Sequence, residues 1–253
     1  MSFRDNIRDS WLVNQFIAHK GLHDKEHPEN TLGAFEQAIK NNYAIELDVQ
    51  MLKDGTLIVF HDKAVSELTG KDCYLSKMTY EDIKDLKIRK TKYGIPTFME
   101  ALKLINGEVP VLIDIKNTSP KKIGKMESLI CDALEGYKGL FAVQSSNPYV
   151  VQWFKNNKPE FIRGIISSFY KNDSEGKQYV KSPIVRAILK RMLLNKKIKP
   201  DFIAYHWENL PNRFVKKYKN LPILAWTVKS QDEYMQVVKH ADNIIFENFK
   251  PKI

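Results

Sequence analysis

Short apolar runs alternate with amphipathic segments along most of the chain. Eight runs have the length and the β-branched content of buried strands, and they cover residues 15–21, 44–51, 111–116, 140–146, 162–168, 201–207, 222–228 and 243–248. Between them, further segments place apolar residues at helical spacing: residues 30–42, 97–105, 125–134, 148–157, 212–220 and 231–240. In the first of these, Leu32, Phe35 and Ile39 share a helix face, and Asn30 is the predicted N-cap. This alternation predicts an α/β fold with a parallel sheet.

Polar residues stand at the end of nearly every predicted strand. They are His19, Glu46, Asp48, Asp114, Lys116, Gln144, Ser146, His206, Trp226 and Glu247. The alternation alone fits either a closed barrel or an open doubly wound sheet. Barrel enzymes build their sites from the carboxyl ends of several strands at once, so this distribution favours a (β/α)8 TIM barrel. We predict a single domain over residues 1–253.

One segment departs from the strand–helix rhythm. Residues 45–62 predict a β-hairpin excursion after the second strand, with Asp54 and Gly55 in a two-residue turn. That turn places Asp48 opposite His61, with about 4.5–5.5 Å between their Cβ atoms. A register shift of one residue would send His61 to the other face of the hairpin.

The chain carries a formal charge of +10 and has a pI of about 9.3. Such a balance suits an anionic partner, which could be nucleic acid, an anionic membrane or an anionic small substrate. The basic residues are spread along the chain, and no helix-turn-helix, zinc-finger or aromatic RNA-binding motif accompanies them. Nucleic acid is therefore the disfavoured partner.

The two cysteines, Cys73 and Cys131, give neither a disulfide framework nor a metal-ligand spacing, which fits a reducing compartment. The N-terminal residues contain acids and only a short apolar run, unlike a signal peptide. No run reaches the ~18 apolar residues of a membrane span. We therefore expect a cytoplasmic protein.

Glu46, Asp48 and Asp114 are carboxylates at the ends of apolar strands. Like charges this close raise one another's pKa unless a cation lies between them. Three carboxylates without cysteine or histidine spacing suit a hard, oxygen-binding ion, so we predict a divalent Mg²⁺ or Ca²⁺ site. The alternative is a set of acids that form only structural salt bridges.

His19 and His61 are the candidates for proton transfer, since both are placed beside the acids and imidazole titrates near neutrality. One could act as base while the other, protonated, acts as acid. Lys20 and Lys116 are the neighbouring cations. They could hold phosphate oxygens as point charges, or form ion pairs with the acids, or do both.

These motifs resemble those of the glycerophosphodiester phosphodiesterase family. Residues 18–62 contain its N-terminal signature in the segments "AHKG", "PENTLGAFEQAI" and "IELDVQMLKDGTLIVFHD", and "LIDIK", "QSSNP" and "AWTVK" resemble its later motifs. The resemblance implies a phosphodiesterase-type TIM barrel. It implies these roles: His19 and His61 as the acid/base pair, Glu46, Asp48 and Asp114 as metal ligands, and Lys116 as the lysine of the second acidic motif.

Three positions depart from the family pattern. Lys20 stands where arginine is usual, which keeps the charge but loses the two-pronged grip on phosphate. Asp114 stands where glutamate is usual, and Ser146 stands where an aromatic residue is common. None of these changes removes a catalytic group, so we expect activity with altered specificity.

Residues 182–200, "SPIVRAILKRMLLNKKIKP", form a basic amphipathic stretch. It could be an outer helix that buries its apolar side against the sheet. It could also be a peripheral helix that contacts an anionic membrane and brings the site to lysophospholipids.

The sequence thus predicts metal-dependent hydrolysis of glycerophosphodiesters to glycerol 3-phosphate and an alcohol, with Trp226 as an apolar wall of the substrate site. One alternative is a lysophospholipase D type of phosphodiesterase acting at a membrane surface. Another is an inert protein that binds phosphoesters or nucleic acid.

Overall fold

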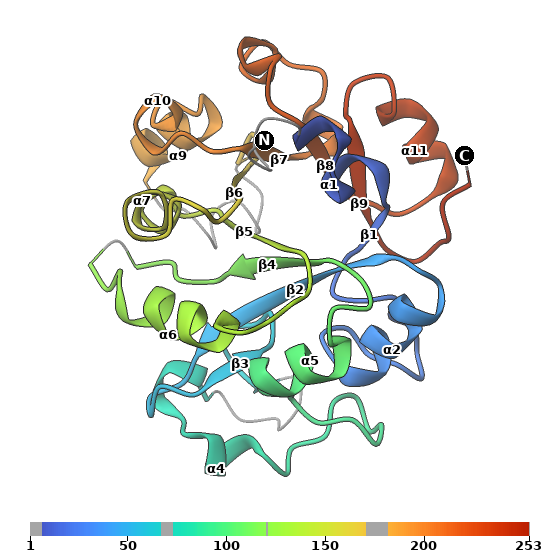
Figure 1. The fold of residues 1–253 in the computed structure, drawn as a ribbon, viewed down its shortest axis with the longest axis vertical. Helices are drawn as coiled ribbons and strands as arrows, with labels where there is room; N and C mark the ends of the chain where they lie inside the picture. Colours follow the sequence, from blue (N-terminus) through green and yellow to red (C-terminus); the bar gives the residue numbers. More distant parts are fainter. Residues whose placement is uncertain (1–6, 67–72, 120, 171–181, 253) are drawn as a thin grey trace. The chain divides into compact units, whose positions relative to one another are not determined.

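The computed structural model describes residues 7–66, 73–119, 121–170 and 182–252, and its chain divides into two compact units (Figure 1). The first unit comprises residues 17–143, and the second comprises residues 1–16 and 144–253. The two units are described in turn. The single domain expected over residues 1–253 stays a prediction.

The first unit holds the N-terminal strands and the hairpin. Its elements are β1 (Ile17–Ala18), α2 (Leu32–Lys40), β2 (Ala44–Met51), β3 (Leu57–Val59), η2 (Leu75–Lys77), α4 (Tyr80–Ile83), α5 (Phe98–Ile105), β4 (Val111–Ile115) and α6 (Lys125–Leu134). Strand β2 lies between β1 and β4, parallel to both, and β3 pairs with it antiparallel. Helices α2 and α5 lie next to each other (Figure 1).

Strand β5 (Phe141–Ser145) lies at the boundary of the units along the chain. The second unit contains α1 (Trp11–Asn14), α7 (Pro148–Asn157), β6 (Arg163–Ser167), α9 (Pro183–Lys190), α10 (Asn195–Ile198), β7 (Phe202–His206), η3 (Trp207–Asn209), η4 (Val215–Tyr218), β8 (Ile223–Val228), α11 (Gln231–Val237) and β9 (Asn243–Phe246). Strands β6 to β9 pair in parallel, each with the next along the chain.

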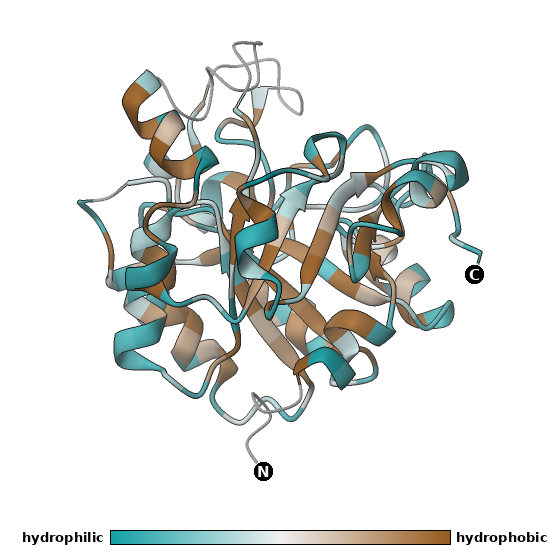
Figure 2. Cartoon of the chain, turned by 90° about the horizontal axis from the view of Figure 1, so that it is seen from above, coloured by the Kyte–Doolittle hydropathy of each residue, from teal (hydrophilic) through white to brown (hydrophobic). Residues whose placement is uncertain are grey.

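The strand order is that of a (β/α)8 barrel, which confirms the predicted fold class. Strands β1, β2, β4, β5, β6, β7, β8 and β9 follow one another in chain order, and β3 is an extra strand on β2. Every residue of β4 and of β9 is buried, as expected of parallel strands covered on both faces. Figure 2 shows brown residues along the strands, whereas the helices carry both brown and teal residues.

Side-chain caps begin several of the helices, and the one N-cap predicted from the sequence is shifted by a residue. Thr97 and Glu100 form a reciprocal capping box that starts α5, and Pro148 occupies the first turn of α7. Helix α2 is capped by Thr31, whose side chain accepts from Ala34, so the prediction of Asn30 as N-cap is wrong by one residue. Asn30 has a left-handed backbone, with φ of 57°, and its side chain is used elsewhere.

The hairpin is confirmed, but its predicted register is wrong by one residue. Val49 pairs with Val59, so Phe60 and not His61 comes opposite Asp48. The loop has three residues rather than two, because Gly55 adopts a left-handed φ of 94° that closes such loops. The Leu52 amide and the Thr56 carbonyl oxygen, 2.9 Å apart, form the last hydrogen bond before the loop.

Two predicted helices are shorter than expected. The stretch 212–220 forms the 3₁₀ helix η4, and the stretch 182–200 is divided between α9 and α10. Over the described residues, no helix combines the length and the apolar character needed to cross a lipid bilayer.

Candidate active site

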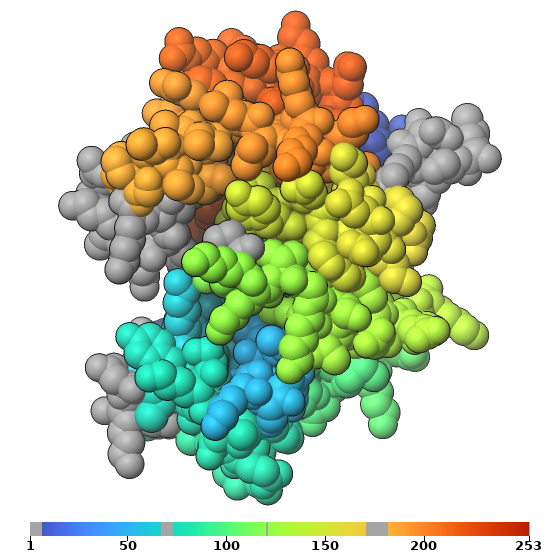
Figure 3. Space-filling model, turned by 90° about the vertical axis from the view of Figure 1, so that its left-hand side faces the viewer, coloured from blue at the N-terminus to red at the C-terminus, as the bar shows by residue number. Residues whose placement is uncertain are grey.

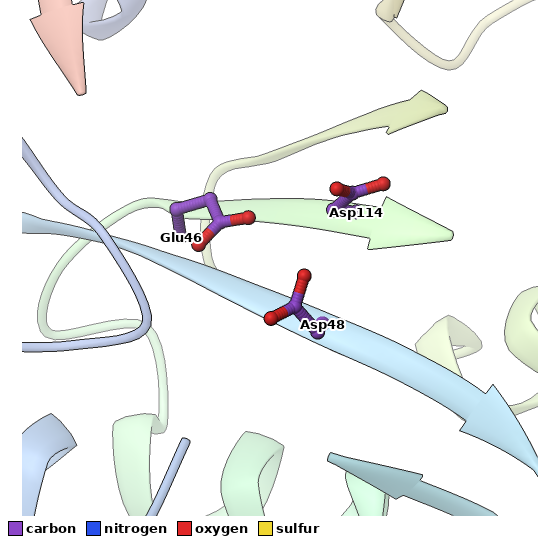
Figure 4. A group of neighbouring side chains, drawn as sticks. All are labelled: Glu46, Asp48 and Asp114. Atoms are coloured by element: carbon purple, nitrogen blue, oxygen red, sulfur yellow. The ribbon is translucent and has the colours of Figure 1, made fainter. Parts of the chain in front are cut away.

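Three buried carboxyl groups of the first unit meet at β2 and β4. Glu46 and Asp48 share one face of β2 because side chains alternate along a strand, and the parallel register pairs Asp48 with Asp114. The exposed fractions of the three residues are 2%, 0% and 5%. One oxygen of each lies within 4.8 Å of the others, and Figure 4 shows the carboxyl groups facing a common space. We call Glu46, Asp48 and Asp114 the acidic trio.

The three carboxyl groups of the acidic trio differ in how readily they ionise. Burial, followed by repulsion from Asp48 and Asp114, raises the pKa of Glu46 well above its ordinary value. Burial also raises the pKa of Asp114. Burial opposes ionisation of Asp48 too, but nearby cationic groups, with Lys116 foremost, hold its pKa below the ordinary value. Asp48 is therefore the member of the trio that stays ionised most readily.

Lys116 supplies a positive charge directly to the trio. It follows β4, and its Nζ lies 2.8 Å from Asp48 Oδ1 and 2.6 Å from Asp114 Oδ2. Burial disfavours its charge, but Asp114, Asp48 and Glu46 together raise its pKa well above the ordinary value. The ion pairing considered for Lys116 is thus present in the structure.

Lys20 contacts the trio through its backbone and another acid through its side chain. Its amide donates to Glu46 Oε2 at 2.9 Å, and its Nζ lies 3.0 Å from Glu29 Oε1. Glu29, in the "PENT" segment, was not among the residues predicted from the sequence. Gly21 must be glycine here, because its φ is 81° and a Cβ would come within 2.9 Å of Ala34.

Asn30 is a site residue that the sequence reasoning assigned only to a helix cap. Its Nδ2 donates to Asp48 Oδ2 at 2.8 Å, and its Oδ1 accepts from the Asp48 amide at 3.2 Å. Its own amide donates to the Lys20 carbonyl oxygen at 2.9 Å. Asparagine tolerates the left-handed backbone found at this position. That tolerance is the signal in the sequence that could have indicated Thr31, and not Asn30, as the helix cap.

His61 lies in the bend after β3. In its protonated form it lowers the pKa of Asp48 and of Asp114, although it is not opposite Asp48 in the hairpin. Its Nδ1 lies 2.9 Å from Asp62 Oδ1, and this hydrogen bond is the main cause that lowers the pKa of Asp62. An ionised Asp62 accepts a hydrogen bond from Nδ1–H, which leaves Nε2 of a neutral imidazole as a proton acceptor.

Gln50 holds the bend that carries His61. Its Nε2 donates to three successive carbonyl oxygens, those of Phe60 at 2.7 Å, His61 at 3.0 Å and Asp62 at 2.8 Å. Gln50 lies on the same face of β2 as Glu46 and Asp48, so strand alternation indicates its place beside the site but not its contacts with the bend.

His19 follows β1 directly, and its charge also lowers the pKa of Asp48. The first unit therefore brings both histidines, both lysines and all three acids of the prediction into one neighbourhood. Trp226 belongs to the second unit, on β8, where its ring lies 5.2 Å from that of His206. Its part in a substrate site stays a prediction.

The acidic trio fits a divalent cation. Its donors are carboxylate oxygens, the ligand type that Mg²⁺ and Ca²⁺ prefer, and they are close enough to share one ion. The trio has three buried carboxyl groups, and the ammonium of Lys116 lies between only two of them. One positive charge does not balance three carboxylates. A cation at this place would lower the pKa of Glu46 and of Asp114 and allow the whole trio to ionise.

Solved structures share the fold. A phosphodiesterase from Oleispira antarctica, in complex with the product sn-glycerol-3-phosphate, matches with a TM-score of 0.74 and 20% identity over 92% of each chain. A glycerophosphodiester phosphodiesterase from Parabacteroides distasonis matches with a TM-score of 0.71 and 19% identity, again over 92% of each chain.

Curated relatives are similar at the level of sequence. A glycerophosphodiester phosphodiesterase from Caldanaerobacter subterraneus is 34% identical over 160 residues, which are 59% of this chain and 65% of that protein. One from Bacillus altitudinis is 33% identical over 111 residues, 41% of this chain and 45% of that protein. The matched segments thus span less than two thirds of these relatives' own lengths.

The family resemblance noted in the sequence is confirmed by a match that covers most of the chain. Residues 19–247 fit the model of the glycerophosphoryl diester phosphodiesterase family. This range runs from His19 through the acidic trio to Glu247, the last of the polar strand ends. The chain belongs to the glycerophosphoryl diester phosphodiesterase family.

Proposed function

We propose that this protein hydrolyses glycerophosphodiesters to glycerol 3-phosphate and an alcohol. The observation that carries the proposal is the buried acidic trio, with Lys116 between two of its members and two histidines near Asp48. Membership of the family supports the same reaction class. A Mg²⁺ or Ca²⁺ ion held by the trio would polarise a phosphoryl oxygen and acidify the attacking hydroxyl.

The two histidines divide the proton transfer. One imidazole takes the proton of the nucleophile, which is water or the neighbouring glycerol hydroxyl of the substrate. The other gives its proton to the leaving alkoxide oxygen. Where the glycerol hydroxyl is the nucleophile, water then opens the resulting cyclic phosphate with the two proton-transfer roles exchanged, so that glycerol 3-phosphate is the product of both routes. The Asp62–His61 hydrogen bond orients the ring of His61, and burial of the trio keeps the polar groups in fixed positions.

The lysines and Trp226 are assigned to the substrate. Lys20 and Lys116 would stabilise the charge on the phosphoryl oxygens, at the expense of their present ion pairs with Glu29 and with the trio. Trp226 would form an apolar wall for the glycerol.

Release of glycerol 3-phosphate from a panel of glycerophosphodiesters tests the proposal. The protein is treated with EDTA and then assayed with Mg²⁺ or Ca²⁺ restored. We expect release that depends on the ion and is lost in His19→Ala and in His61→Ala, while His240→Ala, an exposed histidine of the second unit, keeps full activity. Folded protein that releases nothing with either ion would overturn the proposal.

A lysophospholipase D reaction is the second candidate, because exposed apolar side chains on α9 suit a substrate presented at a membrane. Lysophospholipids in mixed micelles belong in the same panel, with release of the head-group alcohol as the readout, because this reaction leaves an acylated glycerol phosphate and not glycerol 3-phosphate. Faster release from them than from water-soluble diesters would assign the protein to that substrate class. An inert protein that binds phosphoesters or nucleic acid is the third candidate, and any ion-dependent turnover removes it.

The predicted cytoplasmic location, with peripheral membrane contact, stays a proposal. Fractionation of cells into soluble and membrane fractions, followed by a salt wash of the membranes, tests it. We expect the protein in the soluble fraction and in the material that salt releases from the membranes.

A further inference from the structure

The basic segment, residues 182–200 of the second unit, combines positive charge with exposed apolar side chains. Its six basic residues are accompanied by no acid, and they are Arg186, Lys190, Arg191, Lys196, Lys197 and Lys199. Figure 3 shows this segment in light orange on the surface of the molecule. A run of this composition carries a local positive field whatever the pairing of charges elsewhere in the chain.

The first helix of the basic segment leaves two of its apolar residues, Ile184 and Val185, in solvent. None of the residues of α9 is buried, and the exposed fractions are 72% for Ile184 and 43% for Val185. Leu193, just after the helix, is 57% exposed. Burial against the protein is confined to the later part, where Met192 and Ile198 are only 2% and 1% exposed. The outer-helix alternative therefore accounts for the end of the segment and not for its beginning.

The second unit fixes α9 by its C-terminal end. Hydroxyl groups from elements of the same unit donate to carbonyl oxygens at its end and just after it: Ser167 to Leu189 at 3.0 Å, Tyr205 to Lys190 at 3.3 Å and Tyr218 to Met192 at 3.2 Å. The ammonium of Lys190 also lies 4.2 Å from the centre of the Phe169 ring. The exposed apolar residues thus stand on an anchored helix.

We propose that the basic segment docks on an anionic lipid bilayer. Ile184, Val185 and Leu193 enter the boundary between head groups and acyl chains, and the basic side chains pair with the lipid phosphates. Nucleic acid fits this surface less well, because exposed aliphatic side chains gain nothing from a phosphate backbone. The proposal is independent of the proposed hydrolysis, since its readout is binding to lipid.

Co-sedimentation with vesicles tests the apolar part. The full chain is mixed at low salt with vesicles of equal parts phosphatidylglycerol and phosphatidylcholine, and with vesicles of phosphatidylcholine alone. We expect binding to the anionic vesicles only. The double variant Ile184→Ser/Val185→Ser should lose most of it, whereas Met235→Ser/Val238→Ser, a pair of similarly exposed apolar residues on and just after α11, should bind as the parent does.

A matched pair of triple variants tests the charge. Lys196, Lys197 and Lys199 are exposed and have the same spacing as Lys216, Lys217 and Lys219 on and beside η4. Changing the first three to glutamine should weaken binding by about fivefold for each charge removed. Changing the second three should leave binding within about twofold of the parent.

Three outcomes would overturn the proposal. The first is no binding to anionic vesicles at low salt by folded protein. The second is an equal loss of binding in both lysine triple variants, which would mean that net charge and not the basic segment attracts the lipid. The third is binding of the parent to a short DNA duplex but not to vesicles, which would assign the surface to nucleic acid. Circular dichroism spectra that match the parent's establish that each variant is folded.

Discussion

The side-chain amide of Gln50 donates a hydrogen bond to the backbone carbonyl oxygen of His61, with the two atoms 3.0 Å apart. The same nitrogen also contacts the carbonyl oxygens of the residues on either side, Phe60 and Asp62. A strand residue beside the acidic trio thereby fixes the bend that carries the candidate proton-transfer group. The geometry of that group depends on Gln50 as well as on Asp62.

Replacing Gln50 should therefore impair catalysis without unfolding the protein. In Gln50→Leu the carbonyl oxygens lose their donor, and His61 loses its fixed position. We expect kcat to fall by about 10- to 100-fold, with a loss of about 1–2 kcal/mol in the free energy of unfolding. Kinetics on the preferred diester and urea denaturation provide the two numbers. Gln236→Leu, an exposed change on α11, is the control, and unchanged kcat in Gln50→Leu would contradict this account.

Two substitutions separate the roles of Asn30. Asn30→Gly removes the side-chain amide that donates a hydrogen bond to Asp48, but glycine still adopts the left-handed backbone readily. Asn30→Ala removes the same hydrogen bond and also puts a residue that disfavours the left-handed backbone at this position. Both should weaken ion binding by about tenfold, since a group that orients a ligand is lost. Only the alanine variant should lose a further ~1 kcal/mol or more of stability. Calorimetric titration with Mg²⁺ and thermal unfolding measure the two effects, and equal stability of the variants would refute the backbone argument.

Lys116→Met removes the ammonium from between Asp48 and Asp114. Without an added ion, two buried carboxylates then face each other, and we expect a loss of about 3 kcal/mol in the free energy of unfolding. Saturating Mg²⁺ or Ca²⁺ should restore more stability to this variant than to the parent, because the ion takes over the missing charge. Thermal unfolding in EDTA and in excess ion measures the difference. A smaller gain in the variant would mean that Lys116 and the ion do not share a place.

The raised pKa of Glu46 makes the ion-free protein less stable as the pH rises. Below the unfolded pKa, near 4.5, the group is protonated in both states and contributes nothing. Above it, only the folded state holds the proton, so stability falls until the pH reaches the folded pKa. Asp114 acts in the same direction. Asp48, whose folded pKa is lowered, contributes a constant stabilisation above its unfolded pKa of 3.8.

Urea denaturation in EDTA, between about pH 5 and pH 7, measures this slope. We expect the decline to be smaller in Glu46→Gln, because the amide cannot ionise. Glu108→Gln, a change at an exposed glutamate, is the control and should keep the slope of the parent. A slope that is the same in all three proteins would show that Glu46 ionises normally in the fold.

The sequence predicted the sheet better than it predicted the connections. Strands β2 and β4 are marked by apolar runs that burial on both faces requires, and strand alternation then placed Glu46 beside Asp48. The parallel partner Asp114 followed from the barrel. Both placements depend on regular strand backbone, in which side chains alternate between the two faces with a fixed period of two residues.

The errors fall where the backbone is irregular. A single left-handed residue, Gly55, lengthens the hairpin loop and shifts the register, and local spacing could not distinguish that loop from a two-residue turn. The prediction that this shift would send His61 away from the acids also fails, because the chain leaves strand geometry after Val59. The contact of Asn30 with Asp48 was not predicted because Asn30 also lies in irregular backbone, in the turn before α2.

Lys116 gives the first unit a counter-ion that cannot diffuse away. The rate at which a dissolved ion reaches the site during folding depends on the concentration of that ion. The ammonium of Lys116 is joined to Asp114 by the chain, two residues away, so it is present throughout folding. The carboxyl groups of Asp48 and Asp114 can therefore be brought together in ion-poor surroundings. Assembly of the unit would then not wait for a metal ion, and under the proposed function the supply of that ion would control when the site works rather than whether it forms.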